Sequence, residues 1–172
     1  MKDVKERYFK KVYIDNSIIA GTGLFAGEDI DEGDLILTFG GRFCLNTDRY
    51  SGTFLRSTCI GVNEDIMLGE TNDDNRTLSD YINHSCAPNI GLDDALSIVA
   101  IQNISKGSEL VCDYAFWEND NNWVMKTNCK CGSNNCRHII TGKDWVNFSS
   151  GNNYFKFFSP YLRRRILNNE KK

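Results

Sequence analysis

Three cysteines near the end of the chain have the spacing of a metal site. Cys129, Cys131 and Cys136 lie within eight residues of a polar segment, and Gly132 allows the chain to turn between them. Zinc in structural sites takes four ligands in a tetrahedron, and thiolates are common among them. The segment therefore predicts a zinc site whose fourth ligand comes from elsewhere in the chain. On residue type alone, the candidates for that ligand are Cys44, Cys59, Cys86, Cys112, His84 and His138.

A second group of polar side chains lies in the middle of the chain. Asn83, His84, Ser85 and Cys86 follow one another, and Pro88 comes shortly after them. Proline disfavours a helical conformation in the residue before it, so this segment is expected to be a turn that leaves a short element. Asparagine and neutral histidine both donate and accept hydrogen bonds, which suits a nucleotide-like ligand. A histidine taken alone is more often a hydrogen-bonded core residue.

Four motifs together indicate a family. They are, in chain order, Gly21-Thr22-Gly23 followed by Leu24, then Asn83-His84-Ser85-Cys86-x-Pro88-Asn89, then Glu109-Leu110-Val111-Cys112-Asp113-Tyr114, then Cys129-x-Cys131-x4-Cys136. In this order and spacing they resemble the signatures of the SET-domain protein-lysine methyltransferases, including compact bacterial members. A Gly-x-Gly motif alone is weak evidence, whereas the ordered set of four is specific. The resemblance covers about residues 10–142.

The resemblance implies a fold and a division of the chain. We expect a mostly β structure with few short helices: a SET-type β-clip fold of small sheets with a knot-like threaded segment, which is a rare topology. Residues 1–115 would form the SET domain, with the core match at about 10–115. Residues 116–142 would form a post-SET zinc segment. Residues 143–172 would be an extension with a C-terminal helix, docked on the domain.

The resemblance also implies two bound groups. Cys86 would be the fourth ligand of one Zn²⁺ ion, joining Cys129, Cys131 and Cys136, and would tie the C-terminal segment to the cofactor site. The cofactor would be S-adenosylmethionine. Its implied contacts are Gly21, Thr22, Gly23, Leu24, Asn83, His84 and Tyr114.

Tyr114 matches the catalytic tyrosine of the family. Methyl transfer from a sulfonium to lysine needs a neutral amine, although the pKa of a free lysine is about 10.4. An apolar channel favours the neutral form by desolvation. The hydroxyl of Tyr114 would orient the amine and the methyl group, and its own pKa of about 10 makes it a poor base.

Two residues depart from the family pattern. Cys112 replaces a bulky aromatic residue, so we predict room in the lysine channel for di- or trimethylation. Asp80 stands where many members have arginine, which leaves one cofactor contact open. Phe116 and Trp117 follow Tyr114 and are, with Cys112, weak candidates for lining the channel, as is Trp123, because aromatic faces suit an alkyl chain and a methylammonium.

Short apolar runs predict the elements that must position these residues. Ser159 and Pro160 have the types found at a helix start, and Leu162 and Ile166 would then share one face. Trp145 is a candidate for covering an adenine ring, and packing is its alternative role. The predicted strands are residues 12–14, 35–39, 98–101 and 110–112.

Charge is distributed unevenly along the chain. Residues 1–13 carry a net charge of +3, residues 14–123 carry −14 and residues 124–172 carry +8, which sum to −3. An acidic body attracts basic partners and repels a phosphate backbone. We therefore expect a protein substrate with a basic, lysine-containing segment, for example a histone, and no direct binding of nucleic acid. The run Arg163-Arg164-Arg165 is interpreted as a solvated helix face.

The composition excludes several other classes. The chain has 172 residues, of which 41% are apolar and 25% charged, as in globular domains. No apolar run approaches the roughly 18 residues that span a bilayer, so no membrane partner is expected. The first residues lack an apolar signal region, which favours the cytoplasm, with delivery into a host nucleus left open. Seven cysteines, an odd number, favour reduced thiols.

The main hypothesis is thus an S-adenosylmethionine-dependent protein-lysine N-methyltransferase. The alternative is a zinc-stabilised SET-like binding module without turnover, for which Cys112 and Asp80 leave room. A redox sensor built on the cysteine cluster is a weaker third hypothesis. Binding of S-adenosylmethionine separates the first two from the third.

Overall fold

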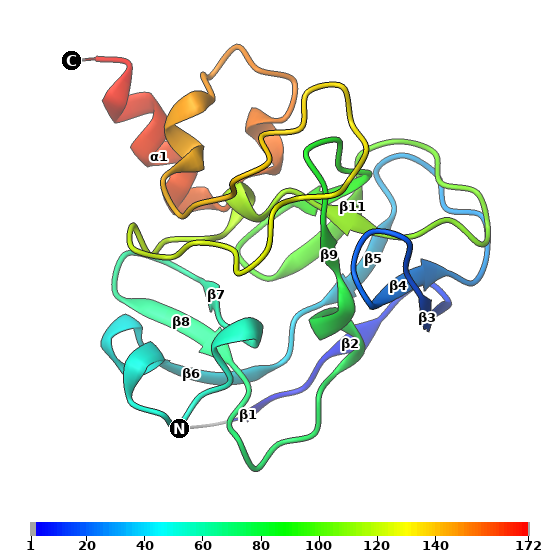
Figure 1. The fold of residues 1–172 in the computed structure, drawn as a ribbon, viewed down its shortest axis with the longest axis horizontal. Coiled ribbons are helices and arrows are strands. Elements are labelled where there is room, and N and C mark those ends of the chain that lie inside the picture. Colours follow the sequence, from blue (N-terminus) through cyan, green and yellow to red (C-terminus); the bar gives the residue numbers. More distant parts are fainter. Residues whose placement is uncertain (1–2, 172) are drawn as a thin grey trace.

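The chain folds mainly into short strands joined by turns (Figure 1). The computed structural model describes residues 3–171. The strands are β1 (Asp3–Val4), β2 (Arg7–Tyr8), β3 (Val12–Asn16), β4 (Thr22–Ala26), β5 (Leu35–Thr38), β6 (Gly41–Leu45), β7 (Ile60–Gly61), β8 (Ile66–Gly69), β9 (Asn83–His84), β10 (Ile90–Leu92), β11 (Ser97–Ala100) and β12 (Val111–Cys112). The helices are the 3-10 turns η1 (Asn46–Tyr50), η2 (Arg56–Thr58), η3 (Leu78–Tyr81), η4 (Tyr114–Phe116), η5 (Asp144–Asn147) and η6 (Phe155–Phe157), and the α-helix α1 (Pro160–Asn169).

The strands of the described residues form four small sheets. Two antiparallel sheets have the strand orders β1-β6-β8-β7 and β10-β11-β5-β2. Strands β3 and β4 form an antiparallel hairpin, in which Val12 pairs with Ala26 and Asn16 with Thr22. Buried positions alternate in part along β4: Leu24 and Ala26 are fully buried, and Phe25 between them is partly exposed. The glycine motif is therefore held at one end of a hairpin whose other end enters the core.

Strands β9 and β12 form a parallel pair that joins two of the motifs. Asn83 lies opposite Val111, and His84 lies opposite Cys112. The pairing continues through Ser85, whose N–H donates to the carbonyl of Cys112 at 2.9 Å. Parallel neighbours require a long connection between them. Segments far apart in sequence are thus brought side by side near the centre of the molecule (Figure 1).

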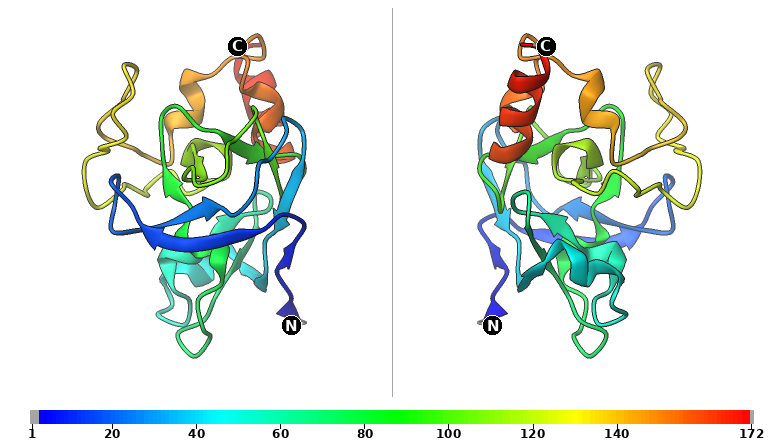
Figure 2. Two further views of the ribbon diagram at one scale, coloured as in Figure 1. Left: turned by 90° about the vertical axis from the view of Figure 1, so that its right-hand side faces the viewer. Right: turned by 90° about the vertical axis from the view of Figure 1, so that its left-hand side faces the viewer.

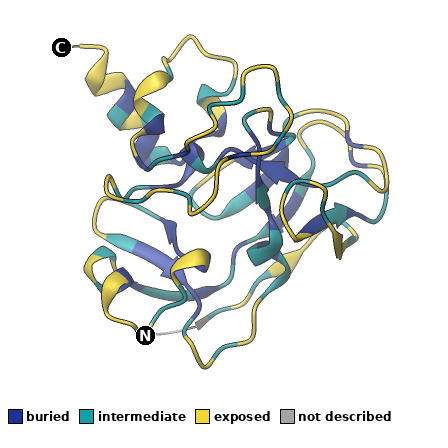
Figure 3. Cartoon of the chain, viewed as in Figure 1, coloured by how far each residue is buried: buried dark blue, intermediate teal, exposed yellow. Residues whose placement is uncertain are grey.

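The core lies beneath the β10-β11-β5-β2 sheet and extends to the C-terminal segment. Its strands read as nearly continuous apolar runs, as in β5, where Ile36 and Leu37 are fully buried. Buried residues concentrate in these strands, whereas many residues of the connecting loops are exposed (Figure 3).

Residues near the C-terminus complete this core. Tyr161, Leu162 and Ile166 of α1 are buried together with it. The ring of Phe158 lies 4.7 Å from that of Phe116, centroid to centroid. The hydroxyl of Tyr161 donates to the carbonyl of Trp117 at 3.1 Å. Figure 2 shows α1 beside the body of the domain, away from the N-terminal strands.

The main features of the expected fold are present. The molecule is a set of small sheets with a C-terminal helix, and each of the four predicted strands overlaps an observed one. Ser159 is at the N-cap of α1, but its hydroxyl makes no capping hydrogen bond. Leu162 and Ile166 do share the buried face. Among the described residues, no helix is long and apolar enough to cross a membrane.

Candidate functional site

The four predicted cysteine ligands meet at one point. The sulfur atoms of Cys86, Cys129, Cys131 and Cys136 all lie within 4.8 Å of one another. A tetrahedral zinc site with Zn–S bonds of about 2.3 Å places its sulfurs about 3.8 Å apart, so the cluster fits such an ion after a small contraction. Cys86 comes from the turn after β9, and the others come from the loop before η5. Of the six candidates for a fourth ligand, the fold selects Cys86.

The electrostatic environment of the cluster already favours one thiolate. Burial raises the pKa of Cys131, but hydrogen bonds from the backbone of Ser133 and from its cysteine neighbours outweigh it and lower the pKa to about 6. Burial raises the pKa of Cys86 to about 11. The thiolate is the form that binds a metal. A cation in the centre would supply the positive charge that the other three thiols need.

His84 connects this cluster to Tyr114. Its Nδ1 accepts a hydrogen bond from the backbone N–H of Tyr114 at 3.2 Å, and its Nε2 lies 3.3 Å from the sulfur of Cys86. Because Nδ1 accepts, the proton of the neutral ring is assigned to Nε2, which then donates to the sulfur. Burial lowers the pKa of His84 to about 4, so the ring is neutral near pH 7. His84 therefore orients a metal ligand and the backbone of Tyr114.

Arg137 makes a second connection between the cysteine loop and β12. Its guanidinium donates two hydrogen bonds of 2.7 Å to the carboxylate of Asp113, and its Nε donates to Asp144 at 2.8 Å. Its backbone N–H points at the sulfur of Cys86 at 3.4 Å. Asp113 is 1% exposed and precedes Tyr114 directly. The sequence analysis missed Arg137, although it follows the last cysteine of the motif.

Asn83 and the glycine loop form a cradle that Glu109 supports. The amide nitrogen of Asn83 donates to the carbonyls of Ala20 and Thr22, at 3.2 and 3.1 Å, and to the carboxylate of Glu109 at 2.8 Å. A Cβ at Gly23 would lie 2.3 Å from that carboxylate, so a larger residue there would displace Glu109 from its hydrogen bond with Asn83. The loop is thereby fixed against β9.

This cradle fits a polar cofactor. The amide of Asn83 is oriented by three hydrogen bonds through its nitrogen, and among the described residues its oxygen has no partner. The loop backbone beside it is exposed at Gly21 and Thr22. An oriented acceptor beside open backbone is what a ligand with donor groups requires. Leu24, by contrast, is fully buried in the core, so its side chain supports the loop from beneath.

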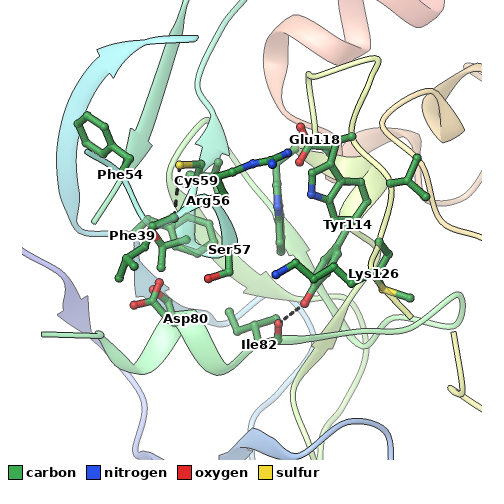
Figure 4. Close-up of a pocket in the computed structure, with 18 of the residues that line it drawn as sticks. Phe39, Phe54, Arg56, Ser57, Cys59, Asp80, Ile82, Tyr114, Glu118 and Lys126 are labelled. Atoms are coloured by element: carbon green, nitrogen blue, oxygen red, sulfur yellow. Dashed lines mark hydrogen bonds between the residues drawn. The ribbon is translucent and has the colours of Figure 1, made fainter. Parts of the chain in front are cut away.

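Tyr114 lines a cavity whose wall includes Ile82, the residue before β9. The cavity has a volume of about 650 Å³ (Figure 4). The hydroxyl of Tyr114 donates to the carbonyl of Ile82 at 2.8 Å. Burial raises the pKa of this hydroxyl, so it stays protonated. The residues that line the cavity include Phe39, Phe54, Arg56, Ser57, Cys59, Asp80, Ile82, Tyr114, Trp117, Glu118, Trp123 and Lys126.

Aromatic rings surround Tyr114 on two sides. The ring of Trp117 lies 5.5 Å from the Tyr114 ring, and that of Trp123 lies 6.1 Å away in an edge-to-face arrangement. Both tryptophans line the cavity. Phe116 does not: it is fully buried against Phe158, because successive residues of η4 point in different directions. The expectation that Phe116 lines a channel is therefore corrected to a core role.

Cys112 is also absent from the lining of this cavity. Its side chain is fully buried, and its sulfur lies 3.7 Å from the carbonyl of Asp113. The small side chain therefore leaves no visible extra room in the cavity. The wall opposite Tyr114 is formed instead by residues around η2, which the sequence analysis did not identify. No chemical motif marks that segment.

A buried ion pair supports the wall of the cavity. Arg49, which is 2% exposed, donates to the carboxylate of Glu118, which is 4% exposed. Arg49 also lies 3.8 Å from Asp120. Asn119 donates to the carbonyl of Asn63 at 3.0 Å. These contacts join the segment after Tyr114 to the β1-β6-β8-β7 sheet.

Three further candidate residues, Asp80, His138 and Trp145, make contacts within the protein itself. Asp80 accepts from the backbone N–H of Thr77 at 2.9 Å, at the start of η3, and lines the cavity. His138 has a positive φ of 61°, and its carbonyl accepts from the N–H of Cys129 at 2.7 Å. Trp145 packs against the core, and its indole nitrogen is buried without a partner among the described residues.

Comparison with known proteins adds a family and a fold. A family model described as "SET domain" matches residues 21–115. The solved structure of KRYPTONITE, in complex with mCHG DNA and SAH, is similar with a TM-score of 0.61 and 21% identity, over 77% of this chain and 29% of that one. At this identity the likeness concerns the fold.

Three curated relatives are histone-lysine N-methyltransferases. The H3 lysine-4 specific enzyme of Schizosaccharomyces pombe is 32% identical over 145 residues, which is 76% of this chain and 15% of that protein. The protein trr of Drosophila melanogaster is 30% identical over 79% of this chain and 6% of its own length. ASHH3 of Arabidopsis thaliana is 28% identical over 81% of this chain and 40% of its own length. The chain therefore spans less than half the length of each.

Proposed function

The chain belongs to the SET-domain family, and on that basis we propose that it is a protein-lysine N-methyltransferase that uses S-adenosylmethionine. The substrate would be a lysine in a basic protein segment such as a histone tail. The observation that carries this proposal is the position of Tyr114: its hydroxyl is at the cavity, and its backbone is hydrogen-bonded to His84, next to Asn83 of the cradle.

The residues of the cradle are those that would hold the cofactor. The open oxygen of Asn83 would accept from a donor group, and the exposed backbone at Gly21 and Thr22 allows close approach. S-adenosylmethionine, when bound, supplies a methyl group on a positively charged sulfonium. The fixed position of the loop relative to β9 comes from Glu109.

The residues of the cavity would prepare the lysine. The rings of Tyr114, Trp117 and Trp123 present apolar faces to its alkyl chain and favour the neutral amine by desolvation. The Tyr114 hydroxyl, fixed on the carbonyl of Ile82, is a group that can orient the amine. Because burial raises its pKa, it stays protonated and does not serve as the base. The amine proton leaves through the open cavity to solvent.

The zinc site would hold the turn after β9 and the later cysteine loop together. Cys86 adjoins β9, whereas the other three ligands belong to the later loop. A metal bound to all four fixes that loop beside Tyr114 through His84 and Arg137.

Charge supports a basic substrate. Residues 14–123 carry a net charge of −14, whereas the cavity itself is lined by two acidic residues, Asp80 and Glu118, and two basic ones, Arg56 and Lys126, so the argument concerns the acidic body as a whole. Acidic surroundings speed the association of a basic peptide and weaken that of a phosphate backbone. The charge pattern thus favours a histone-like tail over nucleic acid.

The test is methyl transfer from labelled S-adenosylmethionine to a panel of histones, with Tyr114→Phe alongside. We expect label on a histone band, and a loss of turnover in the variant of about 10²-fold or more, with cofactor binding kept. Cofactor binding is measured by calorimetry. If the protein binds cofactor and labels neither histones nor other proteins of a lysate, the binding-module alternative replaces the enzyme.

A further inference from the structure

One lysine of the chain points into the cavity of Tyr114. Lys126 is among the residues that line the cavity, and Figure 4 shows its side chain extending from the rim toward the Tyr114 hydroxyl. In the part of the chain that the structure describes, no hydrogen bond or ion pair holds its ammonium group. Its position is therefore not explained by a structural contact.

The backbone around Lys126 is held on both sides. The N–H of Met125 donates to the carbonyl of Ile140 at 2.9 Å, and the N–H of Cys129 donates to the carbonyl of His138 at 2.7 Å. Both bonds join this segment to the one that follows the cysteine cluster. Lys126 thus projects from a segment whose backbone is fixed, three residues before a predicted metal ligand.

The surroundings of the side chain are those proposed for a substrate lysine. The rings of Tyr114, Trp117 and Trp123 line the same cavity as Lys126. Lys126 is exposed overall, as Lys130 is, and what distinguishes it is its place in the lining of the cavity beside these aromatic rings, whose faces suit an alkyl chain and an ammonium group. A tethered group also has an effective concentration on the order of millimolar at a site that its tether can reach.

We propose that Lys126 is a self-methylation site of this protein and that it occupies the place of the substrate lysine when no peptide is bound. This inference rests on the proposed function. In the reaction the Lys126 amine gives up one proton to solvent, and its lone pair forms the new N–C bond. The sulfonium donor loses its methyl group, keeps the electron pair of the broken C–S bond and leaves as the neutral thioether.

The main experiment incubates the full chain with S-adenosylmethionine and no peptide, followed by peptide mass spectrometry. We expect a methyl group on Lys126. Lys126→Arg and Tyr114→Phe should each remove it, whereas Lys130→Arg should keep it, because Lys130 is exposed in the same loop and does not line the cavity. The fraction methylated per unit time should not change on about tenfold dilution of the protein, since the amine is tethered.

A second measurement needs no cofactor. In protein with labelled lysine side chains, NMR should show contacts between the ε-methylene protons of Lys126 and the ring of Tyr114, and none for Lys130. Zinc content and circular dichroism establish that each variant is folded. Absence of the Lys126 contact in the folded protein contradicts the proposed occupancy.

The outcomes separate this inference from the proposed function. A protein that methylates histones and leaves Lys126 unmodified overturns the inference and keeps the function. A protein that binds no cofactor and methylates neither histones nor Lys126 overturns both the inference and the proposed function. A fraction methylated per unit time that rises with protein concentration shows transfer between molecules and overturns the tethered geometry. Methylation of Lys126 without any histone product supports the inference and removes histones as the substrate class.

Discussion

At the scale of single residues, Arg137 has more polar contacts with the site than any motif residue of the cysteine loop. It joins Asp113, Asp144 and the sulfur of Cys86. Asp113 is almost completely buried, and a buried carboxylate is stable only when it is paired. The pair therefore sets the position of the residue directly before Tyr114.

Replacing Arg137 by alanine should destabilise the protein strongly. The change leaves the Asp113 carboxylate buried and unpaired, which costs about 3–5 kcal/mol. Urea unfolding measures this as a lower transition midpoint. The matched control is Arg164→Ala. Arg164 forms an ion pair of 3.6 Å with Glu64, but both side chains are exposed, so the effect of this change should stay within about 0.5 kcal/mol. Equal effects of the two changes would contradict the role given to Arg137.

Glu70 makes stability depend on pH. Burial raises its pKa to about 7, with smaller contributions from Asp80, Asp74 and Glu6, while Arg42 acts in the opposite direction. The folded protein thus keeps a proton that the unfolded chain loses near its usual pKa of 4.5. Stability is fully present below that value, so the free energy of unfolding should fall as pH rises from about 5 to 8.

Glu70→Gln should remove most of this dependence. The neutral amide resembles the protonated carboxyl, so the variant should exceed the wild type at pH 8 by about 1–3 kcal/mol and differ little at pH 5. Urea unfolding at both values measures it. Glu32→Gln removes the same charge from an exposed position and should leave the pH dependence intact. An unchanged slope in Glu70→Gln would contradict the assignment.

Motif residues could be predicted and their supports could not. Asn83, Cys86 and Tyr114 belong to motifs whose residue types and spacing are specific, and the structure brings them to one region. Arg137 is an ordinary basic residue until its partners are known. Phe116 shows the reverse error: its type suits a channel, but the direction of its side chain depends on the turn of η4.

At the scale of elements, the β9–β12 pair and the cysteine loop depend on each other. The turn after β9 carries Cys86, and the loop carries the other three sulfurs. Burial raises the pKa of Cys86 and of Cys129, so without a metal these two thiols favour the protonated form, which does not bind a metal.

Removing the metal should loosen the loop before it unfolds the sheets. We expect one zinc ion per chain, released by a strong chelator together with a lower melting temperature and a loss of cofactor binding. Cys136→Ser should reproduce this loss. Cys44→Ala should keep the zinc, because Cys44 lies in a separate apolar cluster with Cys59 and Met67. Full zinc binding by Cys136→Ser would contradict the ligand set.

Strands with continuous apolar runs were predictable, and the others were not. β5 and β11 are such runs, and both were expected. The sheet of β6, β7 and β8 was missed because β6 contains Arg42 and Cys44 and has no clear alternation. Its register depends on pairing with β8, which is distant in sequence. Parallel pairing of β9 with β12 is likewise a property of the whole chain.

At the scale of the whole molecule, α1 is part of the domain core. Leu162 is fully buried, whereas Leu167 on the same helix is 40% exposed. Leu162→Ala should therefore cost about 2–4 kcal/mol in the free energy of unfolding. Leu167→Ala should cost less than about 1 kcal/mol. Denaturant unfolding measures both, and a cost below about 1 kcal/mol for Leu162→Ala would contradict the role of α1 in the core.

The position of these core residues in the chain has a consequence for biosynthesis. Phe158, Tyr161, Leu162 and Ile166 are translated after all four motifs, yet Phe158 packs on Phe116 and the hydroxyl of Tyr161 donates to the carbonyl of Trp117. A ribosome-bound nascent chain that has exposed only the first three motifs still lacks these side chains and three of the four metal thiols. Its apolar surface next to Tyr114 remains open to solvent and to chaperones until α1 has emerged and packed on it.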